Sequence, residues 1–139
     1  MSSYLEIEDA LQVIDRYGFH IRDIGLLASA LARPGTTVMG TEAYPQLAMK
    51  AAALLESVAR FHPLIDGNKR TAWTLMVLMF WINGYRHDFS TDEGFDLVVD
   101  MAAGKLEKLI SWSRTSVDAY IGVSTPVLAH SMSRAMARA

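Results

Sequence analysis

The most constraining feature of the sequence is a run of ten residues, 73–82, that is apolar except for Thr74. A helix over this run is apolar on almost every side, so other elements must enclose it. Ten residues are too few to span a bilayer, which takes about 20. The first residues also lack the basic region and apolar run of a secretory signal. We therefore expect a soluble, cytoplasmic protein, without membrane contact, built around one buried helix.

Size and composition narrow the possible classes further. The chain has 139 residues, of which 51% are hydrophobic and 20% charged, which predicts one folded domain rather than a disordered chain. A formal net charge of −2 gives no general basic surface, so direct nucleic-acid binding is not expected and any anion site must be local. The absence of cysteine excludes disulfides, thiolate metal sites and cysteine nucleophiles.

Apolar periodicity and capping residues predict an all-α fold. Ser3 and Glu6 have capping-box spacing, and Gly18 ends the helix that follows. Ser90 and Glu93 repeat the capping-box pattern later in the chain. Together with the breaks at glycine and proline, these features predict helices over residues 3–17, 21–32, 45–61, 68–82, 90–103 and 106–119.

One short segment has the composition of a strand. Thr36, Thr37, Val38 and Met39 are mostly β-branched, and Gly35 and Gly40 bracket them. We interpret residues 34–45 as an extended flap between two helices.

The residues with the clearest chemical meaning are consecutive, from His62 to Arg70. They form a loop that enters the N-terminus of the most apolar helix, where backbone N–H groups lack partners and the helix dipole is positive. Gly67 permits close approach of a ligand to the backbone. Lys69 and Arg70 add positive charge in the first turn, where it is unfavourable without a compensating anion. A phosphate group is the natural ligand of such a site.

Two further side chains suit phosphate chemistry. Asp66 could hold a Mg²⁺ ion that bridges phosphates. His62, at the entrance of the loop, has an ordinary pKa suited to a general base. Taken singly, His62 could instead be a helix C-terminal charge, Asp66 an N-cap, and Lys69 and Arg70 solvated surface residues. Their convergence on one helix end favours the site.

This stretch resembles the signature of the Fic/Doc superfamily in its Doc (death-on-curing) branch. Seven positions match, namely His62, Pro63, Asp66, Gly67, Asn68, Lys69 and Arg70. Residues 25–31, 33–34 and 43–45 are similar to the same branch. The resemblance covers about residues 1–119, which we take as the catalytic domain, whereas residues 120–139 form a tail to which we assign no chemistry.

The resemblance implies an all-α fold with the flap over the active site, and ATP and Mg²⁺ as co-substrate and metal. It implies that the histidine takes a proton from a hydroxyl of a target protein, and that the flap holds a target segment by strand addition. Carried over to this sequence, the base is His62, the Mg²⁺ ligand is Asp66, the anion hole is Gly67 and Asn68, the phosphate contacts are Lys69 and Arg70, and the flap is Thr36, Thr37, Val38 and Met39.

The Doc branch further implies a toxin that phosphorylates a translation protein, elongation factor Tu, and is restrained by a Phd-type antitoxin. The self-inhibitory pattern of many Fic proteins, Ser or Thr four residues before Glu-Gly or Glu-Asn, has no copy here, because Phe89 precedes Glu93-Gly94. Two alternatives remain open: transfer of AMP to a protein hydroxyl, and a non-catalytic module that binds a nucleotide or an antitoxin.

The chain differs from many superfamily members at three positions. Leu64 stands where members usually have phenylalanine. The leucine would loosen the loop and lower the rate. Trp73 stands where adenylyl-transferring members have a second arginine, and many of them have a small residue in place of Lys69. The last two differences favour phosphorylation.

Overall fold

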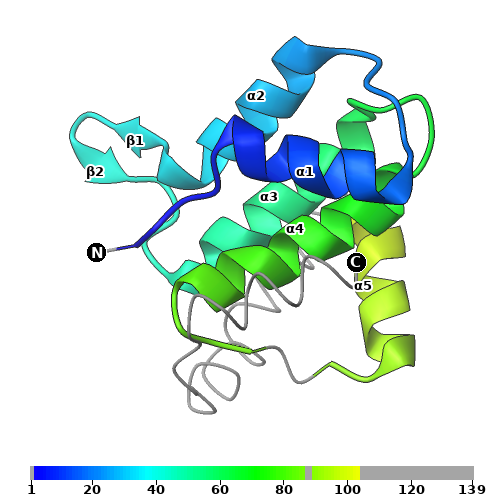
Figure 1. Ribbon diagram of the computed structural model, residues 1–139. Coiled ribbons are helices and arrows are strands. Elements are labelled where there is room, and N and C mark those ends of the chain that lie inside the picture. Colours follow the sequence, from blue (N-terminus) through cyan, green and yellow to red (C-terminus); the bar gives the residue numbers. More distant parts are fainter. Residues whose placement is uncertain (1, 87–88, 104–139) are drawn as a thin grey trace.

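The computed structural model describes residues 2–86 and 89–103 (Figure 1). Its helices confirm the all-α prediction, with one two-stranded antiparallel sheet. The predicted helix 106–119 and the tail 120–139 lie outside the described residues. In chain order the elements are α1 (Ile7–Tyr17), α2 (Ile24–Ala32), the 3₁₀ turn η1 (Arg33–Gly35), β1 (Thr37–Val38), β2 (Thr41–Glu42), α3 (Leu47–Phe61), α4 (Asn68–Ile82) and α5 (Thr91–Ala102).

The centre of the fold is a pair of helices, α3 and α4, which run side by side with α1 and α2 against one side and α5 near the start of α4 (Figure 1). The apolar run behaves as predicted, since Leu75, Met76 and Met79 of α4 are at most 1% exposed. Helix α3 is equally enclosed and buries every residue from Lys50 to Ala59. Two helices therefore share the central position that the sequence assigned to one.

Three helices begin later than predicted, and among them α3 begins at Leu47 rather than at residue 45. Helix α1 begins at Ile7, with Glu6 as its N-cap and Asp9 completing the capping box, so the predicted Ser3–Glu6 box is wrong. Ser3 instead fixes the chain end, because its N–H donates to Asn83 Oδ1 at 2.8 Å and its carbonyl accepts from Asn83 Nδ2 at 3.0 Å. Helix α2 begins at Ile24, three residues later than predicted, with Asp23 as its N-cap.

The predicted flap is a β-hairpin. Thr37 pairs with Glu42 and Val38 with Thr41. Both turn residues have positive φ, 53° at Met39 and 81° at Gly40, as a two-residue type I′ turn requires. In the part of the chain described by the structure, no helix combines the length and apolarity needed to cross a bilayer.

Candidate active site

The site centres on the loop between α3 and α4, residues 62–67, which we call the catalytic loop. His62 caps the C-terminus of α3 with φ 57° and ψ 62°, a left-handed conformation that is uncommon outside glycine. Pro63 and Leu64 are buried, whereas His62, Ile65 and Asp66 are exposed. The loop is thus anchored in its middle and presents its histidine and its carboxylate to solvent.

Asn68, the first residue of α4, holds the loop through side-chain hydrogen bonds to its main chain. Its Oδ1 accepts from the N–H of Leu64 at 2.8 Å, and its Nδ2 donates to the carbonyl of Leu64 at 2.9 Å. The same Nδ2 lies 3.5 Å from Nδ1 of His62. Because the side chain is committed to the loop, Asn68 can contribute to an anion hole through its main-chain N–H.

The connection between α1 and α2 holds the loop from the other side. The N–H groups of Arg22 and Asp23 both donate to the carbonyl of Pro63, at 2.8 and 2.9 Å, and the N–H of Ile65 donates to the carbonyl of His20 at 2.9 Å. Sequence reasoning interpreted Arg22 and Asp23 only as a surface helix start. Asp23 is the N-cap of α2, which begins three residues later than predicted, and nothing in the local sequence indicated the contact with a loop 40 residues away.

Gly67, the N-cap of α4, is required by its surroundings. Its φ is 79°, and a Cβ at this position would overlap the ring of Phe19. Glycine thus lets the chain turn into α4 beneath an aromatic ring.

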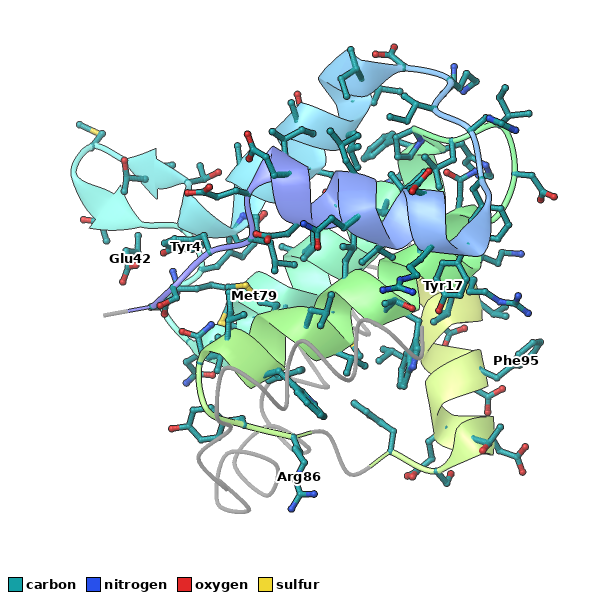
Figure 2. All side chains as sticks on the ribbon, in the orientation of Figure 1. Tyr4, Tyr17, Glu42, Met79, Arg86 and Phe95 are labelled. Atoms are coloured by element: carbon teal, nitrogen blue, oxygen red, sulfur yellow. The ribbon has the colours of Figure 1, made fainter. Side chains whose placement is uncertain are left out.

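The start of α4 has the features of an anion site. Helices α2 and α5 are capped by side-chain oxygens, whereas α3 and α4 have neither a side-chain cap nor an acidic residue in their first turns. Its first three residues are Asn68, Lys69 and Arg70, and both cations are exposed. The Arg70 guanidinium lies 5.8 Å from the ring centre of Tyr17, at the end of α1 next to this turn (Figure 2). Unpaired N–H groups and two cations together fit a phosphate.

Asp66 is the candidate metal ligand. Its Oδ1 accepts from the N–H of Gly67 at 2.8 Å, and its side chain is exposed. Residues 2–86 and 89–103 contain no cluster of three or more metal-binding side chains. A single exposed carboxylate fits Mg²⁺, which proteins commonly bind through one or two carboxylates together with substrate phosphates.

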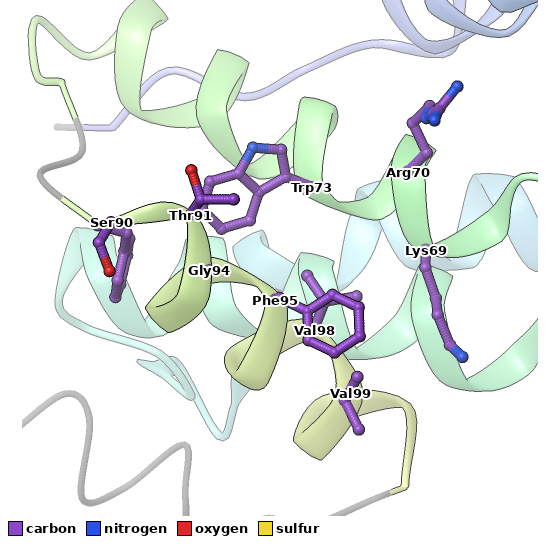
Figure 3. Close-up of a pocket in the computed structure, with 10 residues that line it drawn as sticks. Lys69, Arg70, Trp73, Ser90, Thr91, Gly94, Phe95, Val98 and Val99 are labelled. Carbon is purple, nitrogen blue, oxygen red and sulfur yellow. The ribbon is translucent and has the colours of Figure 1, made fainter.

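A cavity of about 610 Å³ lies beside the anion site, between α4 and α5 (Figure 3). Lys69 and Arg70 stand at one end, and Ser90 and Thr91 at the other. Trp73 packs against the core and also forms part of the cavity wall. The remaining lining is apolar and comprises Phe89, Gly94, Phe95, Val98 and Val99.

The structure does not bring the predicted flap residues to the catalytic loop. Lys50, in the first turn of α3, binds Glu42 of the hairpin with Nζ and Oε1 2.8 Å apart, and His62 follows the other end of the same helix (Figures 1 and 2). A helix of 15 residues is about 22 Å long. Thr36, Thr37, Val38 and Met39 therefore lie toward the start of α3, and their role in holding a target segment stays a prediction.

The fold and the loop together define a class of protein, a small helical domain in which a loop that begins with a histidine enters the N-terminus of a buried helix. Residues 2–80 match the model of the Fic/DOC family, and the chain belongs to that family. It is 48% identical over 107 residues to Toxin Doc of Mycolicibacterium smegmatis (strain ATCC 700084 / mc(2)155), a match that covers 73% of this chain and 82% of that protein.

Proposed function

We propose that this protein is the toxin of a toxin–antitoxin system and transfers the γ-phosphoryl group of ATP to a hydroxyl of a target protein, elongation factor Tu. The observation that carries the proposal is the uncapped, doubly cationic start of α4 next to His62. The family and the name of the M. smegmatis relative support it.

The proposed reaction uses one group for each task. His62 accepts the proton of the target hydroxyl while the hydroxyl oxygen forms a bond to the γ-phosphorus. The bond between the γ-phosphorus and the β–γ bridging oxygen breaks, and ADP leaves. Main-chain N–H groups at the start of α4 and the side chains of Lys69 and Arg70 stabilise the charge on the transferring group. Asp66 would hold Mg²⁺, which would neutralise phosphate charge when bound.

The choice of the γ-phosphoryl rests on the side chains around the anion site. One helix N-terminus holds one phosphate in line with the hydroxyl that His62 activates. Adenylyl-transferring relatives hold the far phosphates with a second arginine, and Trp73 has no charge and only one N–H donor. Lys69 adds its charge close to the loop instead. The apolar cavity beside Lys69 and Arg70 offers space for the nucleoside.

Labelled ATP tests the reaction. We expect label from γ-³²P-ATP, and none from α-³²P-ATP, on elongation factor Tu in the presence of Mg²⁺. His62→Ala should abolish transfer, whereas His20→Ala should not, because His20 contributes only its main-chain carbonyl to the loop. Label from the α position would establish adenylylation, and no label from either position would favour the non-catalytic module.

Growth tests the biological role. Expression of the wild-type chain should arrest growth, and co-expression of a Phd-type antitoxin should relieve the arrest. His62→Ala, expressed to the same level and folded by circular dichroism, should be harmless. Arrest by that variant would rule out the proposed role of His62.

A further inference from the structure

Arg22 has a side chain that reaches across to the end of α3. Its Nε donates to the carbonyl of His62 at 2.8 Å, and its Nη2 donates to the carbonyl of Phe61 at 3.0 Å. Its main-chain N–H also donates to the carbonyl of Pro63 at 2.8 Å. One residue of the α1–α2 connection thus binds three consecutive carbonyls that lead into the catalytic loop.

The two carbonyls bound by the guanidinium belong to a helix end. The last carbonyls of an α-helix have no intrahelical partner, and the helix dipole places partial negative charge on them. A planar guanidinium offers two parallel donors that match two such oxygens. Arg22 therefore acts as a C-terminal cap for α3 that is supplied by another element.

The backbone of His62 depends on this kind of support. Its left-handed conformation is unfavourable for a residue with a Cβ and persists only when the surrounding structure fixes it. Nδ1 of its imidazole lies 3.5 Å from Asn68 Nδ2, at the limit of a hydrogen bond. The orientation of the two peptide planes that Arg22 binds therefore sets the direction of the His62 side chain.

We propose that Arg22 is a positioning residue that fixes the backbone of His62 and so aims its imidazole at the target hydroxyl. The kinetic part of this inference rests on the proposed function. Arg22 itself need not contact ATP or the target, because both of its side-chain bonds go to main-chain carbonyls.

Kinetics separate positioning from substrate binding. Arg22→Ala should lower kcat about 10- to 100-fold, as expected for a misplaced catalytic group, and leave the KM for ATP within about threefold. Arg22→Lys, which can cap one carbonyl but not both in a fork, should retain an intermediate kcat. Arg16→Ala is the matched control, since Arg16 is exposed in the last turn of α1. An unchanged kcat in Arg22→Ala, or a rise in KM alone, would overturn the inference.

Nuclear magnetic resonance decides the same question without activity. The imidazole Cε1–H resonance of His62, assigned by its loss in His62→Ala, should shift or broaden in Arg22→Ala and remain unchanged in Arg16→Ala. Arg22→Lys takes the place of Arg22→Ala if the latter does not fold. A wild-type chain without transferase activity would refute the proposed reaction, whereas an unperturbed His62 resonance would refute the role of Arg22.

Discussion

The side-chain amide of Asn68 holds the main chain of Leu64 at both its donor and its acceptor, over 2.8 and 2.9 Å. Asn68 is 7% exposed and Leu64 is 1% exposed, so water cannot easily replace either bond. Because the same amide lies 3.5 Å from Nδ1 of His62, one residue joins the start of α4, the anchored middle of the loop and the proposed catalytic base.

Loss of this amide should be costly. Asn68→Ala leaves a buried N–H and a buried carbonyl unpaired, at about 1–3 kcal/mol each, so the free energy of unfolding should fall by about 2–6 kcal/mol in urea titrations. Asn83→Ala is the matched control, because Asn83 also makes amide hydrogen bonds, mainly at an exposed helix end. It should lose about 1 kcal/mol. Equal losses in the two variants would contradict the special role of Asn68.

Gly67 should tolerate no side chain. Gly67→Ala combines a positive φ, which costs about 1–2 kcal/mol, with overlap of Phe19, which costs about 1–3 kcal/mol. Gly18→Ala is the control, since Gly18 has φ 77° and nothing within 4 Å of its Cβ position. In thermal unfolding, the Tm of Gly67→Ala should lie well below the Tm of Gly18→Ala. In a Phe19→Ala background the overlap is gone, so Gly67→Ala should lower the stability less than it does in the wild-type chain. An equal loss in the two backgrounds would contradict this explanation.

The sequence was sufficient for features that depend on local chemistry. Residues 68–82 are apolar on nearly every side, and Gly67 and Asn83 stand at their ends, so α4 matches its prediction at both bounds. Ser90 and Glu93 likewise located the start of α5. The order of loop, glycine and cationic first turn was predicted for the same reason, since these residues are adjacent in the chain.

Features that depend on distant contacts could not be predicted. Arg22 is an ordinary exposed arginine until the fold brings the end of α3 to it. Lys50 and Glu56 are charged residues of the kind usually found on a protein surface. Both are buried in α3, because Lys50 pairs with Glu42 and Glu56 pairs with Arg33. The extended flap was predicted but its tight turn was not, because methionine is not a typical residue for the positive φ that Met39 adopts.

Leu64 should not behave as a defect. The superfamily pattern suggests that phenylalanine would restore a tighter loop, but Leu64 is already 1% exposed and pairs with Ile21 in an isolated β-bridge. Leu64→Phe therefore overpacks a filled site and should cost about 1–3 kcal/mol in the free energy of unfolding. Leu64→Met, similar in volume, should cost less than about 1.5 kcal/mol. A Leu64→Phe variant with higher stability and higher kcat would show that the loop is underpacked.

Lys50 should control the hairpin more than the global fold. Its side chain is 1% exposed, and its ammonium binds Glu42 and, at 3.3 Å, the carbonyl of Pro34. Burial alone would lower the pKa of Lys50, but hydrogen bonds to Glu42 and Tyr4 raise it overall. Lys50→Met keeps the apolar stem, so the unfolding free energy should change by less than about 1.5 kcal/mol.

The readout for this variant is hydrogen exchange. The amide of Ala43, which donates to the carbonyl of Thr36 across the base of the hairpin, should exchange faster in Lys50→Met. Amides in the middle of α4 should keep their protection. Uniformly faster exchange would mean that Lys50 supports the whole core rather than the hairpin.

The capping box of α5 should make stability depend on pH. The N–H of Ser90 donates to Glu93 Oε1 at 2.9 Å, and this main-chain bond, with a further contribution from the Ser90 side chain, lowers the pKa of Glu93 from its usual 4.5. A carboxyl with a lowered folded pKa stabilises the fold above its unfolded pKa, and the contribution is lost as pH falls through the folded pKa. Glu93→Gln keeps an acceptor for the box but removes the charge. The stability difference between wild type and Glu93→Gln should therefore be present near pH 7 and vanish well below pH 4.5 in parallel urea titrations. A difference that stays constant across this range would show that the charge of Glu93 contributes nothing, and that the cap acts through its geometry alone.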